Sequence, residues 1–175
     1  HVDDAVQNGS TTAMSFWVAN GATSAKQMQL GPTGTLYIGD TANANMTQGL
    51  TVNMGANDNE IITLKSSDVT HAMTGQTEAD TFLTITKGNN TQGNPSVTGF
   101  SSGTRGLQLV GNHTTDNTDQ ASDGNSAIMV RANLRSGTGL TSCASGANIF
   151  GVRNAGSVVY LIDGAGNVHY DGTTN

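Results

Sequence analysis

The chain has 175 residues, of which only 11% are charged and 5% aromatic, whereas 23 are glycine, 25 threonine and 18 asparagine. A net charge of −6 with only seven Lys and Arg excludes the basic surface that nucleic-acid binding needs. No apolar run approaches the roughly 18 residues of a membrane span, so we expect no membrane insertion.

Threonine favours strands because it is β-branched, while asparagine and glycine favour turns. The strong helix formers are scarce, and no stretch shows helical spacing of apolar residues. Apolar residues reach 35% at low net charge, which is not the composition of a disordered chain. The composition therefore predicts a folded, all-β protein.

Short alternating runs predict eleven strands, separated by glycine-, asparagine- and proline-rich turns. In chain order they cover residues 14–19, 27–30, 35–38, 50–54, 60–65, 81–86, 106–110, 127–133, 148–153, 158–162 and 167–170. Three of the intervening segments, 31–34, 88–95 and 163–167, have hairpin or loop chemistry.

The first and last parts of the chain resemble each other. The pattern Phe16-x-Val18-x-Asn20 recurs as Phe150-x-Val152-x-Asn154. After a two-residue offset, four further positions align, namely Leu30, Gly34, Leu36 and Ile38 with Ile162, Gly166, Val168 and Tyr170. We predict a β-meander module over 1–48, a central β region with long loops over 49–147, and a second meander over 148–175.

Thin sheets of this kind have little apolar surface to bury alone, so we expect copies of the chain to associate. The predicted architecture is an elongated, intertwined homotrimer of β-prism or β-helix-like form, with a β-sandwich as the alternative. The residues predicted to form the oligomer core are Leu36, Ile38, Val158, Leu161 and Val168. Tight reversals are expected at Gly34, Gly39, Gly164 and Gly166.

The only cysteine, Cys143, has no partner for a disulfide within the chain. We interpret it as a small packed residue, with a reactive or intermolecular thiol as the alternative. Stability then depends on packing or on association.

The histidines do not have the spacing of an intrachain metal site. In a trimer, His71 or His169 could instead form a ring of three imidazoles on the axis; the alternative is a hydrogen-bonded or solvent-facing side chain. Three carboxylates, Asp116, Asp119 and Asp123, lie within eight residues in an oxygen-rich segment that suits calcium. That segment lacks the glutamate of an EF-hand, and a solvated loop explains it equally well.

No catalytic apparatus is evident, so we predict neither an enzyme nor a cofactor. The sequence has no nucleophile elbow, phosphate loop or dinucleotide fingerprint. Nothing places any two carboxylates at the separation that glycoside hydrolysis needs, although several exist, at Asp58, Glu60, Asp68, Glu78 and Asp80. Trp17 is the only tryptophan and lies in a predicted strand, where we expect a core or interface role.

Three segments in order resemble bacteriophage tail-fibre and related virion-appendage proteins. Residues 32–40 followed by 49–53 are similar to a recurring motif of tail-fibre shafts, and residues 154–172 resemble a segment that often precedes a C-terminal chaperone or tip. Residues 64–74 look similar to phage-like sequences without a role that we can assign.

The resemblance implies a homotrimeric structural and adhesive segment, in the virion and extracellular. Other virion proteins and a glycan or protein of the host surface would be its partners. It carries over no catalytic or binding residue. The alternatives are a carbohydrate-binding, lectin-like β-sandwich, a capsid or decoration protein, and a fragment of a polysaccharide depolymerase.

Overall fold

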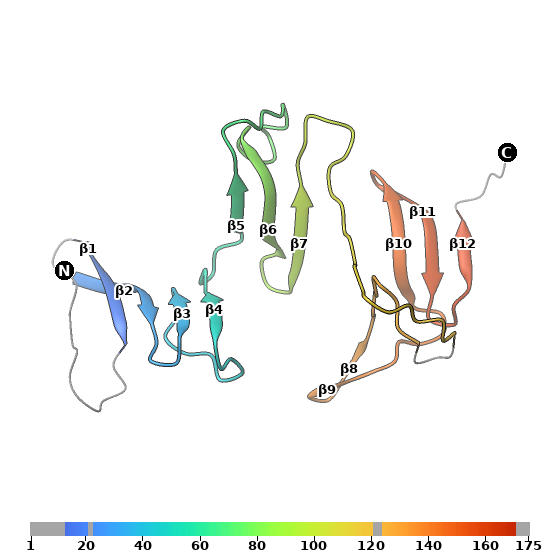
Figure 1. Ribbon diagram of the computed structural model, residues 1–175, viewed down its shortest axis with the longest axis horizontal. Coiled ribbons are helices and arrows are strands. Elements are labelled where there is room, and N and C mark those ends of the chain that lie inside the picture. The colour runs from blue at the N-terminus through green and yellow to red at the C-terminus, as the bar shows by residue number, and fades with distance from the viewer. Residues whose placement is uncertain (1–12, 21–22, 121–123, 171–175) are drawn as a thin grey trace. The chain divides into compact units, whose positions relative to one another are not determined.

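The computed structural model describes residues 13–20, 23–120 and 124–170. These residues form twelve strands in four small sheets, none of which closes into a barrel (Figure 1). The prediction of an all-β fold is confirmed.

The chain divides into two units, one ending at Gln108 and the other beginning at Leu109. This division differs from the predicted modules, whose boundaries follow residues 48 and 147. The first sheet extends past residue 48, because the strand at Gly49–Val52 pairs with it.

The first sheet of unit one has the order β1 (Met14–Asn20), β2 (Thr23–Leu30), β3 (Thr35–Ile38) and β4 (Gly49–Val52). The first three strands form an antiparallel meander, and β4 then pairs in parallel with β3. The parallel pairing continues beyond the strands, since the Asn53 amide donates to the Ile38 carbonyl oxygen at 2.8 Å.

The second sheet of unit one is the antiparallel meander β5 (Glu60–Lys65), β6 (Thr81–Asn89) and β7 (Gly93–Gly99). The composition of residues 88–95 predicts a turn or loop, but β7 begins within them. Pro95 is compatible with this strand because β7 lies at the sheet edge, where a proline costs no ladder hydrogen bond.

Unit two contains the short hairpin β8 (Leu134–Ser136) and β9 (Gly139–Thr141), which the sequence patterns do not predict. Its main sheet is the antiparallel meander β10 (Asn148–Asn154), β11 (Ser157–Asp163) and β12 (Val168–Tyr170). The strands predicted over 106–110 and 127–133 are absent from the structure, which gives these segments no strand.

The second hairpins of the meanders β1–β2–β3 and β10–β11–β12, namely β2–β3 and β11–β12, have corresponding cross-strand pairs. The corresponding cross-strand pairs are Leu30 with Leu36 and Met28 with Ile38 in one, and Ile162 with Val168 and Tyr160 with Tyr170 in the other. Gly34 and Gly166 occupy the same turn position, each with φ of 85°. Only glycine adopts this conformation without strain, which explains the repeated glycine.

The first strands of the meanders correspond with a different offset from the one that the sequence suggests. Phe16 pairs with Met28, and Val152 pairs with Tyr160; a β-bulge follows each pair. Phe16 is therefore equivalent to Val152 and not to Phe150. Beyond the bulge, the first hairpin has two more cross-strand residue pairs than the second, a difference that a sequence alignment on Phe16 and Phe150 does not reveal.

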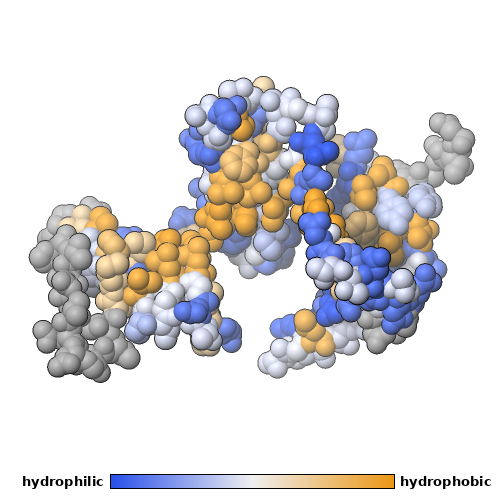
Figure 2. Space-filling model, viewed as in Figure 1, coloured by the Kyte–Doolittle hydropathy of each residue, from blue (hydrophilic) through white to orange (hydrophobic). Residues whose placement is uncertain are grey.

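The described residues contain no buried apolar side chain. Those that are buried are polar, namely Thr35, His71, Thr81, Thr84 and Asp163. Figure 2 shows apolar residues at the surface over β2–β4 and over β5–β7. A β-sandwich needs a filled apolar interior between two sheets, and the described residues provide none.

Candidate functional site

The first sheet carries an apolar face made of two cross-strand rows. Paired residues point to the same side of a sheet, and alternate residues of a strand share that side. The rows are Met14, Leu30, Leu36 and Leu50, then Phe16, Met28, Ile38 and Val52. Most of these side chains stay exposed, since Phe16 is 36% exposed and Leu50 49%.

The second sheet repeats this arrangement on β5–β7. Its apolar face consists of the rows Ile62, Ile85 and Val97, and Leu64, Leu83 and Gly99. Val97 is 53% exposed. The opposite face carries threonine, so the two sides of this sheet differ sharply in polarity.

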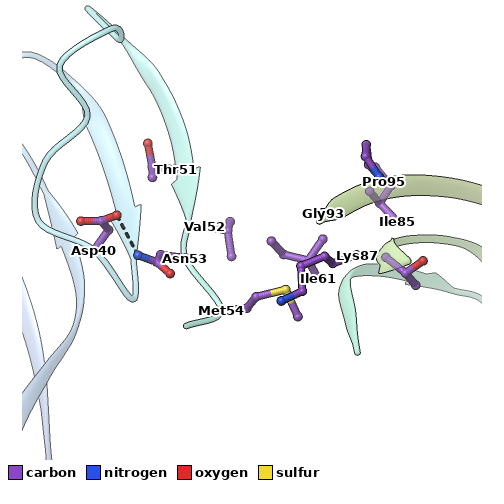
Figure 3. A pocket seen from close by; sticks show the side chains of 11 residues that line it. Asp40, Thr51, Val52, Asn53, Met54, Ile61, Ile85, Lys87, Gly93 and Pro95 are labelled. Carbon is purple, nitrogen blue, oxygen red and sulfur yellow. Dashed lines mark hydrogen bonds between the residues drawn. The ribbon is translucent and has the colours of Figure 1, made fainter. Parts of the chain in front are cut away.

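The two apolar faces of unit one meet at a pocket of about 410 Å³. Val52 and Met54 line it from the end of β4, and Ile61 and Ile85 from the second sheet (Figure 3). Pro95 adds a further apolar surface. The apolar surface of unit one is thus continuous across both sheets.

Asp40 lies at the polar rim of this pocket and accepts three hydrogen bonds. The Thr41 amide donates at 2.7 Å, the Asn53 side chain at 3.0 Å and the Ala42 amide at 3.4 Å. Because these bonds favour the charged carboxylate, they lower the pKa of Asp40, the Thr41 amide most strongly. The Asp40–Asn53 bond, dashed in Figure 3, also fixes the chain where it leaves β4.

In unit two, the face equivalent to that of the first sheet is again apolar. Its rows are Phe150, Ile162 and Val168, then Val152, Tyr160 and Tyr170. Tyr160 packs edge-on against Phe150 and Tyr170, with ring centroids 6.2 and 5.6 Å apart. The internal repeat therefore presents the same kind of apolar face in both units.

The five residues predicted to form the oligomer core do not share one surface. Leu36 and Ile38 lie on the apolar face of the first sheet, and Val168 lies on the equivalent face of β10–β12. Leu161 pairs with Gly151 and His169 on the reverse face. Val158 lines a 290 Å³ pocket together with Leu161.

His71 is buried within unit one and uses both ring nitrogens. Its Nε2 lies 2.9 Å from the Thr81 carbonyl oxygen, and its Nδ1 accepts the Met73 amide at 3.2 Å. The ring also stacks on Phe100 at 5.3 Å. These contacts correspond to a neutral imidazole that donates through Nε2, and they leave no nitrogen for an axial metal.

His169 contacts a buried turn carboxylate, Asp163. The Nε2 atom of His169 lies 3.1 Å from Asp163, which also accepts the Asn167 side chain at 2.9 Å and the amides of Ala165 and Asn167. The Asn167 side chain, followed by His169, lowers the pKa of Asp163 far below its usual value. This network closes the turn between β11 and β12.

The predicted calcium segment shows no assembled site. Asp116 lies 4.0 Å from the His113 ring, and the Asp119 amide bonds to Asn117 at 2.9 Å. Asp123 lies outside the described residues. Within the described ranges, no group of three His, Cys, Asp or Glu could hold a metal ion.

The carboxylates considered for catalysis are in local ion pairs and hydrogen bonds. Asp58 pairs with Lys87 at 2.5 Å, and both Glu78 and Asp80 pair with Lys65. Other local bonds join Asp68 to Ser66 and Glu60 to Thr63. Surface ion pairs of this type contribute about 0–1 kcal/mol each.

Three further findings concern Trp17, Cys143 and the membrane. Trp17 is 48% exposed and pairs with Lys26, next to the bulge at Gln27 of β2. Cys143 is a free, half-buried thiol. In the part of the chain that the structure describes, no helix has the length and hydropathy to cross a membrane.

Neither a protein-family model, nor a curated protein, nor a solved structure matches this chain.

Proposed function

We propose that this chain is a structural and adhesive segment of a virion appendage, of the bacteriophage tail-fibre type, that works as a homotrimer outside the cell. The observation that carries the proposal is that no apolar side chain of the described residues is buried. In a folded protein, such surfaces are covered by partners.

The free energy gained by burying these exposed apolar side chains supports association. Full burial of one Leu, Ile, Val, Phe or Met stabilises by roughly 1.5–3 kcal/mol relative to exposure. The eight side chains of the first sheet's apolar face are partly exposed, none by more than 49%. If about a third of each is covered on association, the gain is roughly 4–8 kcal/mol. That is comparable to the folding stability of an ordinary domain, about 5–15 kcal/mol.

The repeat supports identical copies as the partners. Because β1–β2–β3 and β10–β11–β12 present equivalent apolar faces, one packing arrangement would serve both units. Three copies that turn these faces inward would form a prism with an apolar interior and a polar exterior. The polar reverse faces, such as the threonine rows of β5–β7, suit that exterior.

Electron microscopy of the purified chain tests this function. We expect elongated particles with threefold symmetry in averaged end views. Round particles of the size of one 17.9 kDa chain would refute the proposal.

A further inference from the structure

The reverse face of β5–β7 is a hydroxyl-lined surface. Thr63, Thr84 and Thr98 form one cross-strand row, and the next row is Glu60, Thr86 and Ser96. A sheet whose apolar side is covered still exposes its other side. This face therefore stays accessible whether or not the apolar face has a partner.

The loop between β5 and β6 gives this face a wall. His71, from the loop, stacks on Phe100, and the Thr77 hydroxyl bonds to that of Thr81 at 3.1 Å. Thr81, which accepts this bond, is 0% exposed, and Thr84 further along β6 is 2% exposed. The loop thereby turns a flat sheet into a groove with a defined side.

Two adjoining cavities of about 630 and 720 Å³ make up the groove. They share Glu60, Thr63 and Gln76, so they follow one another along the same face. We call this surface the threonine groove. Its length suits an extended ligand of several units better than one small molecule.

Several polar side chains of the groove form no hydrogen bond within the described chain, and three of them are relevant to ligand binding. The Gln76 amide and the hydroxyls of Thr86 and Thr98 bond to no other residue of the described chain. Each hydroxyl can both donate and accept, and the amide offers two donors and an acceptor. Phe100 supplies the only aromatic surface of the first cavity.

The charges of the groove decide the ligand class. Both lysines nearby are already paired, Lys65 with Glu78 and Asp80, and Lys87 with Asp58. Glu60 adds a further carboxylate to the lining. An anionic ligand would meet like charge, whereas a neutral polyhydroxyl compound matches hydroxyl, amide and carboxylate partners.

We propose that the threonine groove binds a neutral oligosaccharide. The free Gln76, Thr86 and Thr98 groups would bond its hydroxyls, and Phe100 would contact an apolar sugar face. The site uses none of the residues assigned to self-association, so it stands or falls independently of the trimer.

An array of neutral and acidic oligosaccharides provides the first test. We expect retention of neutral glycans; no binding, or binding of acidic glycans alone, would overturn the proposal. Titration of the retained neutral glycan then tests the site. Thr98→Val and Gln76→Ala should each weaken binding about two- to tenfold, since each removes one neutral hydrogen-bonding group.

Thr141→Val is the matched control, because Thr141 is an exposed strand threonine of β9, outside the groove. It should leave the affinity unchanged. Equal affinity in all variants would place the sugar elsewhere and overturn the assignment. Light scattering on the same samples separates this result from the trimer, because Thr98→Val should not alter the mass.

Discussion

Leu36 and Val168 occupy equivalent positions in two copies of one meander. Each lies two residues after a turn glycine with φ of 85° and pairs with an apolar partner, Leu30 or Ile162. Both lie on an apolar face, most of whose side chains are exposed. In the proposed homotrimer, these two faces are the surfaces through which the chain contacts its copies.

A charge on either face should dissociate the assembly. Val168→Asp and Leu36→Asp would each bury a carboxylate against apolar side chains, which costs several kcal/mol. We expect a fall in mass by light scattering. Ser15→Asp is the control, because Ser15 pairs with Gln29 on the polar side of the same sheet as Leu36. An unchanged mass in both face variants would contradict the assignment.

The Asp163 network should make unit two sensitive to acid. The pKa of the Asp163 carboxyl group is lower in the folded state than its ordinary value of 3.8. The ionised carboxylate therefore stabilises the fold above pH 3.8, and this stabilisation is lost as the pH falls through the lower, folded pKa. Denaturant unfolding at pH 7 and at pH 3 measures this loss. Asp163→Asn, which cannot ionise, should show a smaller change between the two; an equal change would exclude Asp163 as a source.

Gly39 should tolerate no side chain, for two separable reasons. Its φ is 70°, and an added Cβ would lie 2.1 Å from the Asn53 carbonyl oxygen. Gly55 has a similar φ of 64° but open space around the same position. Gly39→Ala should therefore lower the free energy of unfolding by more than Gly55→Ala, which carries only the backbone cost of about 1 kcal/mol. Equal losses would mean that the close approach to Asn53 does not matter.

Ala155 offers a stabilising substitution. It has φ of 50° in the turn between β10 and β11, a conformation that is unfavourable for alanine. Ala155→Gly should raise the free energy of unfolding by about 1 kcal/mol. Ala165→Gly should lower it, by about 0.4–1 kcal/mol, because Ala165 does not have a positive φ. A fall in the free energy of unfolding in both variants would contradict the positive φ of Ala155.

The strands that sequence patterns located best are those with strong alternation and clear turns. The predicted ranges 35–38 and 60–65 agree with β3 and β5 residue for residue. The segment 106–110 also alternates but has no partner strand, and pairing is a non-local property that a local pattern cannot contain. The sequence does not predict β7, because Pro95 and two glycines are atypical of a strand. The strand forms nevertheless, because it pairs with its neighbour β6.

The candidate surfaces were predictable only in part. Alternation marks Leu36, Ile38 and Val168 as apolar positions, but the bulge beside Tyr160 reverses the side on which Val158 lies. Sequence spacing could not show that bulge. The threonine groove was also missed, because it depends on a loop that folds back over β6, as the His71–Phe100 contact records.

Sedimentation equilibrium of the purified chain measures most directly whether its copies associate in solution. A homotrimer gives a species of three times the 17.9 kDa chain mass that does not dissociate on dilution to micromolar concentration. A stable 17.9 kDa species that unfolds cooperatively would contradict the proposed homotrimer.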